Sequence, residues 1–165
     1  MSIAVLLREV HILDDLADLQ LGELDSSSRE GTCADGDVAF RQSSTGHTLC
    51  TIQGGEVRTL VDPRTMRMEK GESPAHVTVA TLTPGQIFGA VVLVDPGVRS
   101  ACAECMAETR LLAIPRDEFD ELCEQDTELR YGAKKNIAAD LCLKIRQTDM
   151  MDSEQLLLQA RREKE

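Results

Sequence analysis

Residues 84–101, PGQIFGAVVLVDPGVRSA, form the stretch of this sequence that decides how the fold is interpreted. It opens on the turn signal Pro84-Gly85, continues through a short apolar segment and passes a second turn before Arg99. Gly89 lets the backbone approach a ligand closely, N–H groups at a helix start bind anions, and the guanidinium of Arg99 suits a phosphate. The alternative is a pair of β-turns followed by a surface arginine. The pattern taken alone leaves both interpretations open.

The sequence around this stretch has a β texture from Gly31 to Ile114. Short segments rich in Val, Ile, Thr and Leu are separated by Gly, Pro and Asp turn signals at intervals of about eight to twelve residues, which is typical of a sandwich or barrel. The polar segment 62–76 holds two prolines and is expected to be a long exposed hairpin loop.

Helical patterns flank the β-rich region. Apolar residues three or four apart predict helices within residues 3–25 and 115–150. Pro115 is expected in the first turn of a C-terminal helix, and a longer helix is expected over 128–150. The expected class is therefore α+β with a β-barrel or jelly-roll core, here from residue 31 to 114. The expected units are a domain over residues 1–150 and a charged helical tail over residues 151–165.

Composition excludes several classes of protein. The 165 residues include 18 Lys and Arg against 29 Asp and Glu, a net charge of −11 that repels phosphate backbones. With three Phe, one Tyr and no Trp, there are few aromatic rings on which bases could stack. We therefore expect no nucleic acid partner. No apolar stretch is long enough for a membrane span or a signal peptide, so a cytoplasmic protein with six reduced cysteines is expected.

Three segments together resemble the cyclic nucleotide-binding domain family, which includes catabolite-activator-type regulators. Residues 84–101 resemble its phosphate-binding cassette, P-G-x-x-F-G-E-x-[AS]-L followed by R-[ST]-A, while residues 36–57 and 111–119 resemble the strands before and after it. The cassette residues kept are Pro84, Gly85, Phe88, Gly89, Leu93, Arg99, Ser100 and Ala101. The resemblance covers about residues 5–150. It implies an eight-stranded jelly roll, or double-stranded β-helix, flanked by helices.

The resemblance also implies a ligand site, with cyclic AMP or cyclic GMP as the ligand. The residues implied are Phe88, Gly89, Ala90, Val91, Val92, Arg99, Ser100 and Ala101. The family's glutamate, which accepts the ribose 2′-hydroxyl, is replaced by Ala90; Val92 crowds a position usually held by a small residue, and Cys50 replaces an aromatic. Losing one charged hydrogen bond costs about 1.5–3 kcal/mol, so another phosphate-bearing effector and an empty pocket both stay open.

The cysteines and histidines give no metal or catalytic pattern. Cys102-x-x-Cys105 has a metal or redox spacing, but it stands alone, and on a strand the two side chains face opposite sides. His11, His47 and His76 are isolated. No known catalytic signature is present, so we expect neither an enzyme nor a bound metal.

Three functions stay open from the sequence. The first is a non-enzymatic regulatory sensor in signal transduction, which binds a phosphate-bearing effector. The second is a ligand-independent module that dimerises or docks on a protein partner, since the apolar stripe of Ile137, Leu141 and Ile145 favours a homodimer through helix 128–150. The third is a redox or haem sensor. The fifteen residues after Met150 are too few for the winged helix-turn-helix of the family's DNA-binding members, so we expect no such domain.

Overall fold

The computed structural model describes residues 13, 17–62 and 76–162, with the side chains of the last helix described up to Met150 and at Ser153. Its helices are α2 (Asp18–Ser27), the short 3₁₀ helix η3 (Ala90–Leu93), α3 (Arg116–Gln125) and α4 (Thr127–Arg162). Its strands are β1 (Arg29–Cys33), β2 (Val38–Phe40), β3 (Thr48–Gly54), β4 (Val57–Val61), β5 (Val77–Leu82), β6 (Ile87–Phe88), β7 (Cys102–Cys105) and β8 (Thr109–Pro115). The predicted helical segment before Ala17 and most of the predicted loop between β4 and β5 lie outside the described residues.

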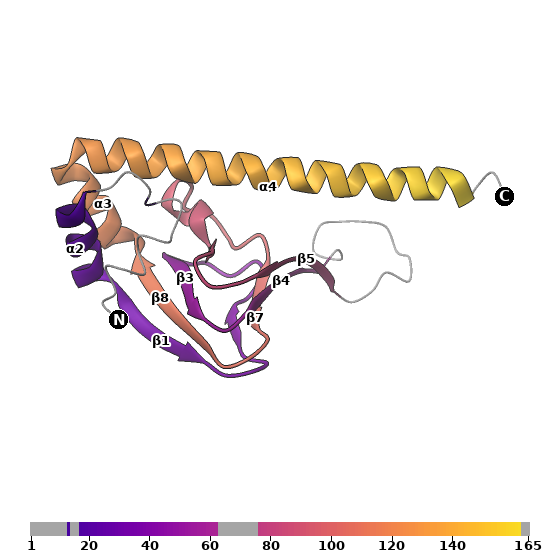
Figure 1. Cartoon of the computed structure of the whole chain (residues 1–165), viewed down its shortest axis with the longest axis horizontal. Coiled ribbons are helices and arrows are strands. Elements are labelled where there is room, and N and C mark those ends of the chain that lie inside the picture. Colours follow the sequence, from indigo (N-terminus) through magenta and orange to yellow (C-terminus); the bar gives the residue numbers. More distant parts are fainter. Residues whose placement is uncertain (1–12, 14–16, 63–75, 163–165) are drawn as a thin grey trace.

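The strands form two antiparallel sheets that face each other, and the helices gather at one end and along one side of them (Figure 1). The strand order is β1-β8-β3-β6 in one sheet and β2-β7-β4-β5 in the other. The predicted α+β class with a jelly-roll core is confirmed. β3 is buried on both faces along Leu49–Ile52 because one face packs on the opposite sheet and the other packs on the helices.

Two clusters of buried side chains hold this arrangement together. One lies between the sheets and includes Ile52, Phe88 and Cys105. The other joins the outer face of β3 and β8 to the helices, and there α4 contributes Leu129 and Ile137. Through these contacts the first part of α4 is fixed against the roll.

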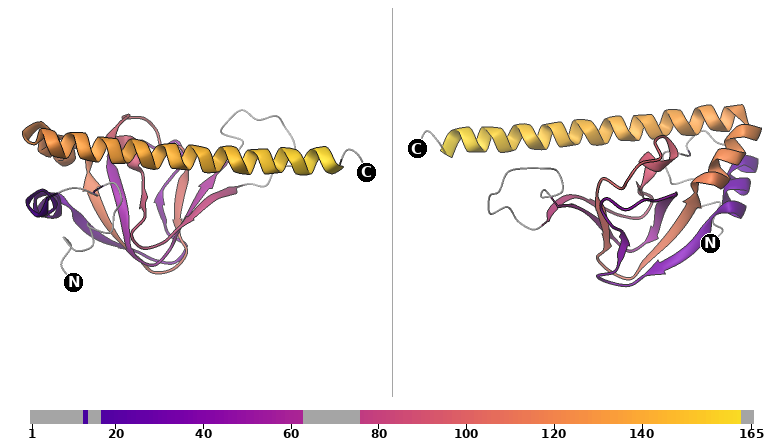
Figure 2. Two further views of the ribbon diagram at one scale, coloured as in Figure 1. Left: turned by 45° about the horizontal axis from the view of Figure 1, so that its top comes forward. Right: turned by 180° about the vertical axis from the view of Figure 1, so that it is seen from behind.

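The start of α3 corrects one expectation, and α4 is longer than the segment 128–150. Pro115 is the last residue of β8, with an extended backbone at φ −66° and ψ 140°, and α3 begins at Arg116. The long helix continues past Met150 to Arg162, through part of the expected helical tail, since no proline follows Thr127 and residues 151–162 are mostly good helix formers. Figure 2 shows α4 crossing the roll and extending beyond it. None of the helices in the described ranges has a segment apolar enough to cross a membrane.

Candidate effector-binding cavity

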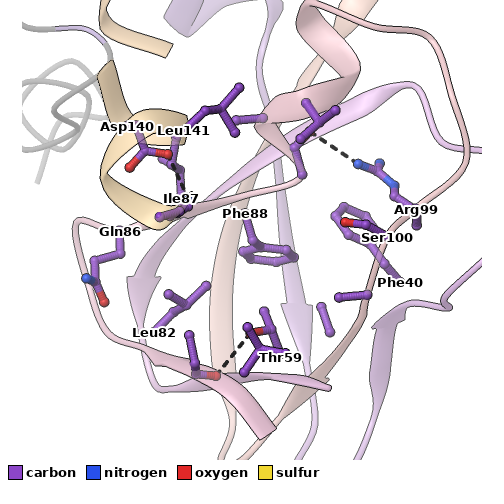
Figure 3. A pocket seen from close by; sticks show the side chains of 18 of the residues that line it. Phe40, Thr59, Leu82, Gln86, Ile87, Phe88, Arg99, Ser100, Asp140 and Leu141 are labelled. Atoms are coloured by element: carbon purple, nitrogen blue, oxygen red, sulfur yellow. Dashed lines mark hydrogen bonds and ion pairs between the residues drawn. The ribbon is translucent and has the colours of Figure 1, made fainter. Parts of the chain in front are cut away.

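A cavity of about 730 Å³ lies between the roll and α4 (Figure 3). Its walls come from β4 and β5, from the β6–η3 segment, from the loop that carries Arg99 into β7, and from residues 140–150 of α4. All eight residues implied by the sequence line it: Phe88, Gly89, Ala90, Val91, Val92, Arg99, Ser100 and Ala101. The fold therefore brings the two halves of the cassette to one cavity.

The turn between β6 and η3 depends on glycine. Gly89 has a φ of 78°, in the left-handed region that favours glycine. A Cβ added there would lie 2.5 Å from Nη1 of Arg99 and 2.9 Å from the Phe40 ring. Gly89 is thus required both by the turn and by the close approach of the arginine.

The η3 wall offers no hydrogen-bonding side chain to the cavity. Ala90 and Val92 are buried and belong to the core shared with the helices. Val91 is 44% exposed. A ribose hydroxyl would find no side-chain acceptor on η3.

Arg99 is the cation of this site, and it is 8% exposed. Its Nη2 donates to the carbonyl of Thr48 at 2.7 Å and its Nη1 to the carbonyl of Gly89 at 3.3 Å. The guanidinium lies 3.8 Å above the centre of the Phe40 ring, and a Cβ at Gly46 would collide with it. Its Nε has no hydrogen-bond partner within the described part of the chain. The loop at Gly46 and the ring of Phe40 together hold the Arg99 side chain inside the cavity wall.

No carboxylate among the described residues pairs with Arg99. Burial lowers the pKa of Arg99, although an arginine in a protein stays protonated. Burial also raises the pKa of the neighbouring Cys50 thiol to about 12, so this thiol is neutral and cannot balance the charge. Arg99 is therefore a buried cation whose partners are two neutral carbonyls and an aromatic face.

The wall formed by α4 is more polar. Nζ of Lys144 lies 2.7 Å from the carboxylate of Asp140, and both groups are partly exposed. Leu141, which follows Asp140 on α4, packs against the core that β3 and β8 share with the helices. Neither Phe40 nor these residues were predicted from the sequence as site residues. The spacing of Asp140, Lys144 and Gln147 on one helical face could have indicated that they share an environment.

The six cysteines are all free. Cys102 lines the cavity, while Cys105 lies on the buried face of β7 in the core between the sheets. The two thiols thus lie on opposite faces of the strand. Burial, with a contribution from Cys33, raises the pKa of Cys105 to about 12. In the described ranges there is no group of three or more His, Cys, Asp or Glu side chains that could hold a metal.

A jelly roll with a buried arginine beside a cavity that α4 borders is the architecture of a regulatory domain. Residues 31–126 match the family model of the cyclic nucleotide-binding domain, and the chain belongs to that family. The predicted family is thereby confirmed.

Similar proteins include a receptor protein and a transcriptional regulator. The chain is 31% identical over 115 residues to the cyclic AMP receptor protein of Thermus thermophilus, an alignment that covers 70% of this chain and 48% of the receptor. The crystal structure of the Thermus thermophilus catabolite activator protein is similar with a TM-score of 0.69 and 26% identity, over 86% of this chain and 61% of that one. The N-terminal domain of a transcriptional regulator from Streptomyces coelicolor A3(2) has a TM-score of 0.70 and 25% identity, over 88% and 94% of the two chains.

The chain spans about half the length of the receptor it matches. The regulatory domain of the Toxoplasma gondii protein kinase PKA, solved with cyclic AMP, shares the fold with a TM-score of 0.65 and 20% identity, over 80% of this chain and 47% of that one.

Proposed function

We propose that this chain is a non-enzymatic regulatory module of the cytoplasm that binds a phosphate-bearing effector, a cyclic nucleotide or another, in the cavity beside Arg99. The observation that carries the proposal is the buried charge of Arg99, which lines the cavity without a carboxylate partner in the described residues. A buried cation with neutral partners gains most from an anion, because charged hydrogen bonds are about twice as strong as neutral ones.

When a phosphate binds, Arg99 would exchange its neutral carbonyl acceptors for a charged phosphate oxygen. The phosphate would take N–H groups of Arg99 that now point at the carbonyls of Thr48 and Gly89, and it would reach the unpartnered Nε. The hydroxyl of Ser100, which is exposed beside it, would supply a further donor. These groups recognise a phosphate without recognising a sugar.

The conformational change that signals effector binding would be transmitted through α4. This helix forms one wall of the cavity and is anchored to the roll by Leu129, Ala133 and Ile137, so an effector that fills the cavity contacts the part beyond the anchor. In this proposal residues 1–150 form the effector domain, and the charged tail over 151–165, of which residues 151–162 continue the same helix, reports a change in how α4 docks.

A second function, dimerisation, has its own supporting observation. Beyond the anchored part, α4 exposes Leu143 and Ile145, which are 54% and 60% exposed. Pairing α4 with its copy over 128–150 would bury this apolar surface, as would a protein partner docked on the same helix. Dimerisation is compatible with effector binding and would also serve a module whose cavity stays empty. Redox or haem sensing has no comparable support among the described groups.

Thermal unfolding tests the effector site. The midpoint should be measured with and without millimolar cyclic AMP, cyclic GMP and cyclic dinucleotides. A compound present at one hundred times its Kd adds about 2.7 kcal/mol to the stability. For a domain of this size the midpoint should rise by roughly 5–10 °C.

Two variants make the test specific. In Arg99→Ala the shift should fall to about half or less, and in Arg110→Ala, which removes an exposed arginine away from the cavity, it should persist. No shift with any phosphate-bearing compound in the unaltered protein would refute effector binding and leave dimerisation as the function to pursue.

A further inference from the structure

Several polar side chains of the cavity wall already have partners within the chain. Oγ1 of Thr59 donates to the carbonyl of Ala80 at 3.2 Å, and Oγ1 of Thr148 donates to the carbonyl of Lys144 at 3.0 Å. The side-chain oxygen of Gln86 accepts the backbone N–H of Thr83 at 2.8 Å.

Asp140 and Lys144 neutralise each other across one turn of α4. Of the described residues that line the cavity, Arg99 is the one with a buried side-chain polar atom that lacks a hydrogen-bond partner. Arg99 is thus the buried group of the wall that is left to hydrogen-bond a ligand, and the exposed hydroxyl of Ser100 follows it in the chain.

Buried apolar side chains form much of the inner wall. Leu82 and Ile87 are buried, and Figure 3 shows them with Phe88 around the same space, with the Arg99 guanidinium at one side. Leu141 adds an apolar side chain from α4. Because a buried polar group without a partner costs free energy, ribose hydroxyls or base edges placed against these walls would bind poorly.

We infer that the effector is an amphipathic phosphate, with one phosphate group held by Arg99 and an apolar body that fills the rest of the cavity. This inference rests on the proposed function and specifies its ligand class. The carboxylate of Asp140 on the opposite wall, already paired with Lys144, disfavours a second phosphate. A volume of about 730 Å³ lies within the range of pockets that bury most of a drug-sized ligand.

Alkyl phosphates of increasing length test this ligand class. Kd values for inorganic phosphate and for butyl, hexyl and octyl phosphate would be measured by titration calorimetry, with cyclic AMP alongside. Each buried methylene strengthens binding about fourfold, so octyl phosphate should bind roughly 15-fold more tightly than hexyl phosphate. It should also bind more tightly than cyclic AMP.

Control ligands and variants separate the cavity from a non-specific apolar surface. Octyltrimethylammonium, which carries the same tail on a cation, should not bind. Arg99→Ala should weaken octyl phosphate roughly 10- to 100-fold, the equivalent of one charged hydrogen bond, and Arg110→Ala should leave it unchanged. If Arg99→Ala does not fold, Ala101→Leu keeps the cation and narrows the cavity beside it, and should weaken octyl phosphate more than butyl phosphate.

The outcomes distinguish this inference from the function on which it rests. Tighter binding of cyclic AMP than of octyl phosphate, or affinity independent of chain length, would overturn the amphipathic class and keep the effector site. Equal binding of octyltrimethylammonium would also overturn it. Absence of binding by every phosphate compound would refute both.

Discussion

Replacing Gly89 by alanine should destabilise the protein, because the turn before η3 cannot accommodate a Cβ without strain, for two independent reasons. The left-handed conformation, with φ at 78°, costs an ordinary residue about 1–2 kcal/mol. The added Cβ would also lie 2.5 Å from Nη1 of Arg99 and 3.0 Å from the carbonyl oxygen of Thr48. Overpacking of this kind costs about 1–3 kcal/mol. The expected loss in the free energy of unfolding is about 2–5 kcal/mol.

Gly36 offers a matched control for this substitution. Its φ is 80°, and no atom lies within 4 Å of the position where a Cβ would stand. Gly36→Ala should therefore lose only the conformational part, about 1–2 kcal/mol. Urea unfolding followed by far-UV circular dichroism gives both values, and the midpoint of thermal unfolding should be roughly 2–12 °C lower for Gly89→Ala than for Gly36→Ala. Equal losses in the two variants would show that Arg99 does not occupy the place beside Gly89, which would remove the basis of the site geometry.

Three further predictions follow from other parts of the chain. Ile145→Glu places a charge on the exposed apolar part of α4 and should raise the dissociation constant of the dimer at least about tenfold, as measured by sedimentation. Lys135→Glu on the same helix should leave this constant unchanged. A monomer at all concentrations of the unaltered protein would contradict the dimer. The pKa of Asp126 is lowered by a hydrogen bond from the side chain of Gln20 and by the N–H groups at the start of α4. The ionised carboxylate therefore stabilises the folded protein above the ordinary carboxyl pKa, and this contribution is lost as the pH falls through the lowered pKa of Asp126. Asp126→Ala should therefore lower the free energy of unfolding at neutral pH and weaken its decrease with falling pH below about pH 4. An unchanged pH dependence in this range would argue that Asp126 does not cap α4. Burial raises the pKa of Cys50 to about 12 while Cys142 is exposed, so alkylation at about pH 8 followed by peptide mapping should label Cys142 first; early labelling of Cys50 would show that the core opens.

Much of the fold could be predicted from the sequence because its turns and apolar periods are local signals. The resemblance of residues 84–101 to the phosphate-binding cassette implied that Phe88, Gly89 and Arg99 share one site, and all three line one cavity. The apolar stripe of the long helix fades near Met150 while helix propensity continues, so the sequence indicated a helical tail but not the end of α4 at Arg162.

The partners of Arg99 could not be predicted from the sequence. Its guanidinium is held by a backbone carbonyl of β3, a carbonyl of Gly89 and the ring of Phe40, contacts that depend on the packing of strands far apart in the sequence. The replacement at Ala90 was visible as a missing acceptor. That this side chain lies in the core rather than in open space required the structure.

A crystal structure of the protein with cyclic AMP or octyl phosphate tests the central claim most directly. The account predicts a phosphate oxygen within hydrogen-bond distance of the Arg99 guanidinium, with the bond from Nη2 to the carbonyl of Thr48, now 2.7 Å, lengthened or lost. A guanidinium still bound to that carbonyl, with the ligand elsewhere or absent from the cavity, would contradict it.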